Sequence, residues 1–165
     1  MPFELQELDG RVHQRKQFDS GNSQRDRYLR DLAGQHARLG FSRTFVLVDS
    51  GQPSEILGFY TLSAAQIDLG QLSEQEQARL PRLPIPAARI GQLAVSRRHQ
   101  RKGLGALLLQ HAVKRAIAVR DHSMGVHLVV VDADSESAIR FYEHFGFQPC
   151  NRERRVLYLA LGKGP

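Results

Sequence analysis

Apolar residues along this chain recur at two spacings, the period of two that marks strands and the period of three to four that marks helices. Strand-like runs occur at 3–8, 45–48, 55–64, 90–95, 126–131 and 156–161. Helical spacing predicts helices over about 23–39, 104–120 and 135–145, and a capping box that begins at Ser73 predicts a further short helix with Ser73 as its cap. The predicted order is therefore β-α-β-β-(α)-β-α-β-α-β.

Two local patterns suggest how these strands pair. Turn-forming residues at 49–53 separate two strand-like runs, which predicts an antiparallel hairpin. The run 126–131 is almost continuously β-branched or apolar, which is typical of a strand covered on both faces. We therefore expect an α/β (mixed α+β) fold with a central mixed sheet of six to seven strands, flanked by helices on both faces, in a single domain over 1–165.

Polar residues and glycines mark the predicted helix ends. Ser23, with Asp26 three positions on, is the expected cap of the first helix, and Gly40 is its stop signal. The last helix is expected to begin at a cap on Asp134 or Ser135 and to stop at Gly146. The apolar face of the long middle helix is predicted to consist of Leu104, Leu107, Leu108, Ala112, Ala116 and Ile117.

The net positive charge of the chain is compatible with several classes of partner. Twenty-three Lys and Arg residues face seventeen Asp and Glu residues, for a net charge of +6. This excess is compatible with a nucleic-acid partner, an acidic substrate, or neither. The basic residues form three clusters, each of which could equally be a solvated face: Arg97, Arg98, Arg101 and Lys102; Arg25, Arg27, Arg30, Arg38 and Arg43; and Arg152, Arg154 and Arg155.

Cysteine usage and hydropathy indicate a cytoplasmic protein without a membrane partner. Cys150 is the only cysteine, so an intrachain disulfide is impossible, and a structural thiol is expected there. No apolar run reaches membrane-spanning length, and the N-terminus lacks a leader pattern. The seven histidines do not show metal-ligand spacing, so no metal is expected; His127 is predicted to be a satisfied histidine of the buried strand.

Residues 100–105, the glycine turn, carry the clearest chemistry. They connect the strand predicted at 90–95 to the helix predicted at 104–120. Glycines allow close approach of a ligand to the backbone, and the first N–H groups of a helix lack intrahelical partners. Arg101 and Lys102 add positive charge, so the arrangement suits a pyrophosphate. A third glycine at the dinucleotide-binding offset is missing, and so is a Walker A loop.

A second motif, residues 141–147, lies in the last predicted helix. Ala138, Phe141, Tyr142 and Phe145 fall on roughly one face of that helix. For Phe141, Phe145 and Ile139 a role in the core is preferred. The hydroxyl of Tyr142 needs a partner or solvent if it is half-buried, so a role in a site is compatible with the pattern but not required by it.

The glycine turn matches the pattern Q/R-x-x-G-x-G/A, in which the chain resembles the GNAT family of acetyl-CoA-dependent N-acetyltransferases. Further segments resemble one branch of that family, the TacT-like acetyltransferase toxins of type II toxin–antitoxin systems. These segments are 18–21, 58–62, 91–95, 130–133 and 141–147. The resemblance covers most of the chain and implies an acyltransferase that uses acetyl-CoA and no metal.

The resemblance also implies a role for each matching residue. Tyr142 is the expected general acid, which protonates the leaving thiolate of CoA. The backbone of Leu93, Ala94 and Val95 is expected beside the thioester and pantetheine, with the Val95 N–H facing the carbonyl. The pyrophosphate is expected at Gln100, Arg101, Lys102, Gly103, Leu104 and Gly105, and further cofactor contacts at Ala133 and Phe141.

Known toxins of this branch acetylate the α-amine of aminoacyl-tRNA and block translation, so the same activity is expected here. An α-amine, with a pKa of about 7.7–8.0, is partly neutral near pH 7, whereas a lysine at about 10.4 needs a stronger base. Asp132 ends a strand and Glu143 is expected to face solvent, so neither is an obvious base. Expected partners are aminoacyl-tRNA, a ribbon-helix-helix antitoxin and a second copy of the chain.

Three alternatives stay open at this point. The acceptor could be a small-molecule amine or a protein N-terminus. A binding module for CoA or nucleic acid, without catalysis, is a third reading of the same residues.

Overall fold

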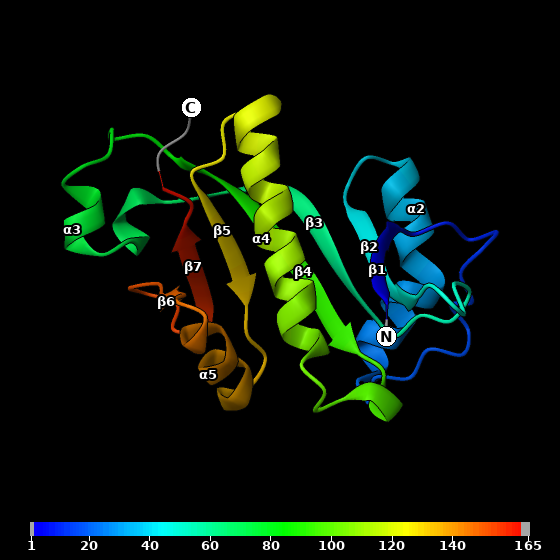
Figure 1. Ribbon diagram of the computed structural model, residues 1–165. Helices are drawn as coiled ribbons and strands as arrows, with labels where there is room; N and C mark the ends of the chain where they lie inside the picture. The colour runs from blue at the N-terminus through cyan, green and yellow to red at the C-terminus, as the bar shows by residue number, and fades with distance from the viewer. Residues whose placement is uncertain (1, 163–165) are drawn as a thin grey trace. The chain divides into compact units, whose positions relative to one another are not determined.

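The structure is a computed structural model that describes residues 2–162. Its strands form one mixed sheet in the order β1-β2-β3-β4-β5-β7-β6. In chain order (Figure 1) the elements are β1 (Phe3–Glu7), α1 (Ser23–Arg27), the π-helical turn η1 (Tyr28–Leu32), α2 (Ala33–Arg38), β2 (Arg43–Asp49), β3 (Gly58–Ile67), the 3₁₀ turn η2 (Leu69–Gln71), α3 (Glu74–Gln77), β4 (Ile85–Val95), the 3₁₀ turn η3 (Arg97–His99), α4 (Leu104–His122), β5 (Leu128–Asp132), α5 (Glu136–His144), β6 (Gln148–Pro149) and β7 (Val156–Ala160).

These elements confirm the predicted mixed sheet with flanking helices. They follow the predicted order except that the short strand β6, which was not predicted, precedes the last strand. The described chain divides into two compact units, residues 2–63 with 91–114 and residues 64–90 with 115–162. Because β3, β4 and α4 each continue from one unit into the other, no linker separates the units at these elements. The assignment of one domain to 1–165 stays a prediction.

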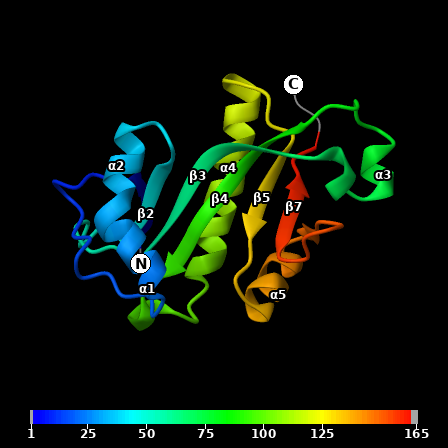
Figure 2. The same cartoon turned by 180° about the vertical axis from the view of Figure 1, so that it is seen from behind.

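The first unit is built on an antiparallel meander. β1 pairs with β2 and β2 pairs with β3, with Leu5 opposite Leu47 and Val46 opposite Phe59. The helical segment α1–η1–α2 lies beside these strands (Figures 1 and 2). Its buried Leu29 and Ala33 join a core cluster with Val46 and Phe59. The predicted hairpin and the predicted first strand are both confirmed.

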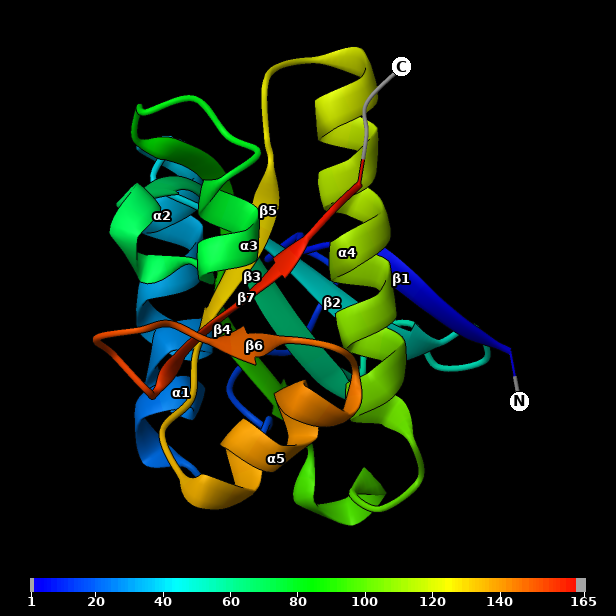
Figure 3. The same cartoon turned by 90° about the vertical axis from the view of Figure 1, so that its left-hand side faces the viewer.

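The second unit contains the parallel pair expected from a β-α-β connection. The first part of β4 runs parallel to β5, and β5 pairs antiparallel with β7. Residues 128–131 are fully buried, which confirms a strand covered on both faces. The short β6 pairs with β7, and α5 leads into it (Figure 3).

The largest differences between predicted and observed strand starts are those of β4 and β3. β4 begins at Ile85 rather than Ile90, because Pro86 is tolerated within it: the Pro86 carbonyl accepts a hydrogen bond from the N–H of His127 at 2.9 Å. β3 begins at Gly58 rather than residue 55. The chain at 49–55 instead forms turns, with a hydrogen bond from the Gln52 N–H to the Asp49 carbonyl.

The first helix begins at a different cap from the predicted one. Asn22 rather than Ser23 is the cap, and its side chain accepts hydrogen bonds from the N–H groups of Gln24 and Arg25. Asp26 instead reaches back to Ser20, accepting from its N–H and hydroxyl at 3.0 and 2.7 Å. Gly40 ends the helix with a φ of 75°, as predicted.

Apolar spacing misplaced three side chains. Leu39, the last residue of the helix predicted over 23–39, is 58% exposed, because the π-helical turn at 28–32 shifts the phase of the residues after it. On α4, Leu107 is exposed and Leu109 is buried in its place. The caps at Ser73 and Ser135 and the stop at Gly146 are confirmed.

Within residues 2–162, no helix is both long and apolar enough to cross a membrane.

Candidate functional site

The glycine turn is held in place by hydrogen bonds within the first unit. The amide of Gln100 donates to the carbonyl oxygens of Val95 and Ser20, both at 2.9 Å. Just before the turn, the Ser96 N–H donates to Leu57 and the Arg97 N–H donates to Asp19, both at 2.8 Å. The turn is thereby fixed both to the end of β4 and to the loop that precedes α1.

Two residues of the turn adopt left-handed backbone conformations. Arg101 has a φ of 65°, and Gly103 has a φ of 79°. A left-handed non-glycine residue carries a conformational cost, and such residues cluster at functional sites. A Cβ on Gly103 would meet nothing within 4 Å, so its backbone conformation, not crowding, is what favours glycine there. Alternating conformations of this kind turn successive N–H groups into an anion-binding hollow.

The start of α4 adds further donors and charge. The helical hydrogen bonds begin with the Leu107 N–H, which donates to the Gly103 carbonyl at 3.2 Å. The N–H groups of residues 104–106 precede that bond and have no helical acceptor. Arg101 and Lys102 are exposed and form no ion pair within residues 2–162. Free N–H groups, the helix dipole and two cations together make an anion site.

The end of β4 is shaped by two residues of β3. A Cβ on Gly58 would lie 2.9 Å from the carbonyl oxygen of Ala94 and 2.9 Å from Cδ1 of Leu108. Glycine at this position therefore lets β3 approach Ala94 and α4 closely. The hydroxyl of the buried Thr61 accepts a hydrogen bond from the Gln92 N–H at 2.9 Å.

In the sequence, Gly58 and Thr61 stand out only as parts of the segment 58–62 that resembles the family, and their structural role was not predicted. The glycine inside an otherwise apolar strand was the available signal, since glycine weakens a strand unless a neighbour approaches it closely. Threonine is common in strands and gave no signal.

Tyr142 lies in the second unit, on the last turns of α5. Its side chain is buried, with 7% of the residue exposed, and its ring centroid lies 5.2 Å from that of Phe141 and 5.5 Å from that of Phe147. Its carbonyl accepts from the N–H groups of Phe145 and Phe147. The ring is thus fixed by aromatic contacts and by the tight end of the helix.

The predicted core role of the neighbouring residues is only partly correct. Ile139 is buried as expected, whereas Phe141 and Phe145 are half-buried.

Ala133 directly follows β5 in the same unit. It is buried, and its N–H donates to the Arg155 carbonyl at 2.7 Å. The preceding Asp132 forms an ion pair with Arg89. Glu143 is exposed, as predicted. Because the charge of Asp132 is opposed by Arg89, that carboxylate is a poor choice for a general base.

The predicted site residues therefore fall into two groups. Residues 93–95 and the glycine turn belong to the first unit, joined by the bond from Gln100 to Val95. Ala133, Phe141 and Tyr142 belong to the second unit, where the two aromatic rings are in contact. Their roles stay predictions.

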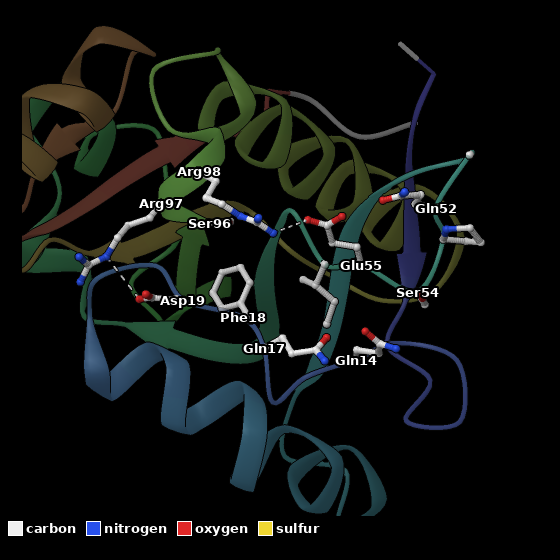
Figure 4. A pocket seen from close by; sticks show the side chains of 13 residues that line it. Gln14, Gln17, Phe18, Asp19, Gln52, Ser54, Glu55, Ser96, Arg97 and Arg98 are labelled. Carbon is white, nitrogen blue, oxygen red and sulfur yellow. Dashed lines mark hydrogen bonds and ion pairs between the residues drawn. The ribbon is translucent and has the colours of Figure 1, made fainter.

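A cavity of about 860 Å³ lies next to the glycine turn within the first unit (Figure 4). Arg97 faces Asp19 and Arg98 faces Glu55 across its rim, each pair at 3.4 Å. Phe18, which is buried, lies among its lining residues. The pairs are largely exposed and contribute little stability, but they neutralise half of the basic cluster predicted around the turn.

Other predicted residues are placed as follows. Cys150 is buried, and burial raises the pKa of its thiol, as expected for a structural cysteine. The prediction for His127 was wrong, because its Nε2 is buried without a hydrogen-bond partner in the described residues. Nδ1 of His99, beside the turn, is in the same state. Residues 2–162 hold no group of three or more His, Cys, Asp or Glu arranged for a metal ion.

Known proteins are similar to this chain in sequence and in fold. A family model described as an acetyltransferase (GNAT) domain matches residues 40–149, which include both the glycine turn and Tyr142. A curated protein of Mycobacterium tuberculosis strain H37Rv, named tRNA-acetylating toxin, is 34% identical over 131 residues, which are 79% of this chain and 76% of the relative.

Two solved structures are similar over nearly the whole chain. AtaT complexed with acetyl-methionyl-tRNAfMet has a TM-score of 0.89 at 25% identity, covering 96% of this chain and 95% of that one. AtaTR bound with AcCoA has a TM-score of 0.82 at 26% identity, covering 96% and 94%. Since the family model spans well over half of the sequence and includes the turn described above, the chain belongs to the GNAT acetyltransferase family.

Proposed function

We propose that this protein is a toxin-type N-acetyltransferase that transfers an acetyl group from acetyl-CoA to the α-amine of aminoacyl-tRNA and thereby inhibits translation. The observation that carries the acetyl-CoA assignment is the glycine turn, with left-handed Arg101 and Gly103 before the free N–H groups of α4. The choice of acceptor is supported by the relative named tRNA-acetylating toxin and by the structure of AtaT with acetyl-methionyl-tRNAfMet.

The residues of the first unit fit the anionic part of acetyl-CoA. A pyrophosphate needs several N–H donors and compensating positive charge, which the glycine turn and the start of α4 supply. The open space at Gly103 leaves room for such a group. In this proposal Gln100, Arg101, Lys102, Gly103, Leu104 and Gly105 hold the pyrophosphate, while Leu93, Ala94 and Val95 lie along the pantetheine and Ala133 and Phe141 make further contacts.

Acetyl-CoA, when bound, supplies a thioester as the acyl donor. Val95 presents its N–H to the thioester carbonyl and stabilises negative charge on that oxygen. The neutral acceptor amine forms a bond from nitrogen to the carbonyl carbon, and the carbon–sulfur bond breaks. Tyr142 gives its hydroxyl proton to the departing sulfur, the amine nitrogen releases one proton to solvent, and Tyr142 recovers a proton from solvent. The products are an amide and free CoA.

We propose an α-amine as the acceptor because neither candidate carboxylate is suited to remove a proton from the amine. Asp132 is paired with Arg89 and Glu143 is exposed, so neither is a good base. An α-amine, with a pKa of about 7.7–8.0, reaches its neutral form near pH 7 without help, whereas a lysine side chain does not. Exposed cations on the turn and elsewhere suit the phosphates of a tRNA carrier.

The same proposal extends to partners and location. A chain related to a protein named as a toxin calls for an antitoxin, which we propose to be of the ribbon-helix-helix type. We further propose a homodimer, a single functional domain over 1–165 and a cytoplasmic location. The single cysteine is a buried free thiol, and free thiols persist in a reducing compartment such as the cytoplasm, which supports the proposed location.

The test measures the transfer of radiolabelled acetyl from acetyl-CoA to purified charged tRNAs, and the same tRNAs without their amino acid serve as the control. We expect label on the aminoacyl group that is released with the amino acid upon mild base treatment. Absence of label on every aminoacyl-tRNA, with label on a small amine or a protein N-terminus instead, would refute the acceptor and retain the acetyltransferase.

A further inference from the structure

The first unit contains another cavity, of about 520 Å³, beside the helix α2. Its walls come from the end of β1 and the loop after it, from α2 and from the start of β2, elements that lie side by side in Figures 1 and 2. All of these segments belong to residues 2–63. The cavity is therefore formed within the first unit alone.

Two arginines of this cavity, the arginine pair Arg15 and Arg38, converge at Gly34 of α2. A Cβ at Gly34 would lie 3.4 Å from Nη1 of Arg15 and 3.5 Å from Nη1 of Arg38. Since both distances start from one point, the two nitrogens lie within about 7 Å of each other, where like charges repel unless an anion joins them. The loop after β1 and the helix α2 thus present two cations to one space.

The carboxylates of the cavity do not compensate this charge, because each of them is held by another arginine. Glu7 is paired with Arg43 at 2.9 Å, and Asp9 is paired with Arg11 at 3.3 Å. Within residues 2–162 the arginine pair forms no ion pair and no side-chain hydrogen bond. The cavity therefore carries two uncompensated positive charges and attracts an anion.

A buried hydroxyl gives a second, independent indication of a ligand. Thr44 lines the cavity with 2% of the residue exposed, and its Oγ1 has no hydrogen-bond partner within the described residues. Along β2 it alternates with Val46, which packs in one core cluster with Ala33 of α2, so the Thr44 side chain points to the face of the sheet that α2 covers. An unpaired buried hydroxyl destabilises the protein, and a ligand that accepts its proton in a hydrogen bond removes this penalty.

The three groups fit a phosphate better than a carboxylate. A carboxylate has two oxygens and is satisfied by a single guanidinium, as Glu7 is by Nε and Nη2 of Arg43. Here the donors come from three separate segments, the loop after β1, α2 and β2. A tetrahedral phosphate has oxygens on several sides and can accept hydrogen bonds from all three.

Neighbouring hollows of the first unit indicate which phosphate is bound. Gly10 and Arg15 also line a smaller hollow of about 300 Å³, together with Lys16. Gln14 and Gln17 belong to that hollow and to the cavity beside the glycine turn, where both are labelled in Figure 4. Each of the three hollows contains basic residues. A row of basic hollows suits a nucleic-acid backbone, which carries phosphates at intervals, better than a single free anion.

We propose that the arginine pair and Thr44 bind a backbone phosphate of the acceptor RNA, using residues other than those proposed for the pyrophosphate of acetyl-CoA. This inference rests on the proposed function, because aminoacyl-tRNA is the RNA which that function supplies. The arginine pair provides the charge, and Thr44 donates a hydrogen bond to a phosphate oxygen. Such a contact positions the RNA without reading its sequence, since every tRNA has a phosphate backbone.

Binding of uncharged tRNA, followed by fluorescence anisotropy at several salt concentrations, tests the site without any transfer reaction. Replacing the arginine pair, Arg15→Gln with Arg38→Gln, should weaken tRNA binding by about tenfold or more and reduce the salt slope by about 1, as for the loss of one phosphate contact. The affinity for acetyl-CoA, measured by calorimetry, should not change, because the glycine turn keeps all of its donors.

Thr44→Val separates binding from a merely structural role. Valine keeps the shape of the side chain and removes the unpaired hydroxyl, so the urea midpoint of the free protein should stay equal or rise. Binding of tRNA should nevertheless weaken by about threefold or more, because one donor to the phosphate is lost. A lower midpoint together with unchanged tRNA binding would show that the hydroxyl has a structural partner, and would overturn the site.

A matched control separates local charge from net charge. Arg82→Gln with Arg152→Gln removes two exposed arginines of the second unit and should leave tRNA affinity within about threefold of that of the unaltered protein. Equal losses in the control and in the Arg15/Arg38 variant, or no loss in that variant, would overturn this inference. So would a loss of inorganic phosphate binding with unchanged tRNA binding, which would indicate a site for a free anion.

Acetyl transfer by the unaltered protein distinguishes failure of this inference from failure of the proposed function. If aminoacyl-tRNA is acetylated and tRNA binding does not depend on the arginine pair, the inference is overturned and the proposed function stands. If no aminoacyl-tRNA is acetylated and tRNA binding does depend on the pair, the RNA site stands and the proposed acceptor is overturned. Neither binding of tRNA nor transfer to any aminoacyl-tRNA would overturn both.

Discussion

Gly58 is the position at which a single methyl group tests the architecture of the donor site. A Cβ there would lie 2.9 Å from the carbonyl oxygen of Ala94 and 2.9 Å from Cδ1 of Leu108. Real Cβ atoms essentially never approach other atoms this closely, so the Gly58→Ala variant must move something. Leu108 is fully buried and has little space to rotate into, while Ala94 is backbone within β4.

The size of the effect follows from the two contacts. Forcing an extra methyl into a well-packed core costs about 1–3 kcal/mol. A small opposing gain of about 0.4–1 kcal/mol comes from the reduced freedom of the unfolded chain. We therefore expect Gly58→Ala to lower the free energy of unfolding by about 1–2 kcal/mol. Because the end of β4 has to yield, we also expect weaker binding of acetyl-CoA.

Urea unfolding, followed by circular dichroism, measures the first quantity, and calorimetric titration with acetyl-CoA measures the second. Gly125→Ala is the matched control, because a Cβ at Gly125 meets nothing within 4 Å and its φ is not in the left-handed region. That variant should be as stable as the unaltered protein or slightly more so. If Gly58→Ala matches Gly125→Ala in stability and in affinity, the close approach of β3 to Ala94 is not a structural requirement.

Three further predictions address the donor site, the proton donor and pH. Tyr142→Phe should reduce kcat by at least about a hundredfold with acetyl-CoA affinity nearly unchanged, since general acid catalysis contributes on that scale; unchanged turnover would remove Tyr142 from the mechanism. Gly103→Glu, which places a carboxylate in the anion site and a side chain at a φ of 79°, should abolish acetyl-CoA binding in calorimetry, whereas retained micromolar affinity would contradict the site. Burial lowers the pKa of His13 below its ordinary 6.5, and its Nδ1 accepts a hydrogen bond from the Asp9 N–H at 3.0 Å. The unfolded chain then binds the proton more readily, so stability should be complete above pH 6.5 and decline as the pH falls below it. Urea unfolding at several pH values, with His13→Gln as a variant that should flatten the profile, measures this decline.

Elements with strong local signals were predictable from the sequence. The continuous apolar run of β5 and the helix caps at Ser73 and Ser135 carry their causes within a few residues, and the structure confirms them. The glycine turn was predictable for the same reason, because strand, glycines and helix are consecutive there. Its left-handed residues agree with the expected anion site.

Features that depend on distant residues could not be read from local patterns. The start of β4 at Ile85 depends on pairing with β5, which no periodicity near Pro86 reveals. The exposure of Leu39 results from a π-helical turn whose cause lies in packing, and the burial of Leu109 depends on what covers α4. The cavity beside Thr44 is lined by segments that are separate in the chain, so no motif could announce it.

The Gln100 side chain explains why the family pattern admits either glutamine or arginine at the first position of the turn. Its amide donates to two backbone carbonyls, of Val95 and Ser20, and so fixes the turn proposed to hold the pyrophosphate. Arginine is the other long side chain with several N–H donors in one plane, so it can make both bonds. Glutamate has nearly the same shape as glutamine and only acceptors. The side chain at this position thus anchors the loop through its N–H donors. Gln100→Arg should therefore preserve the fixed position of the turn, and Gln100→Glu should lose it.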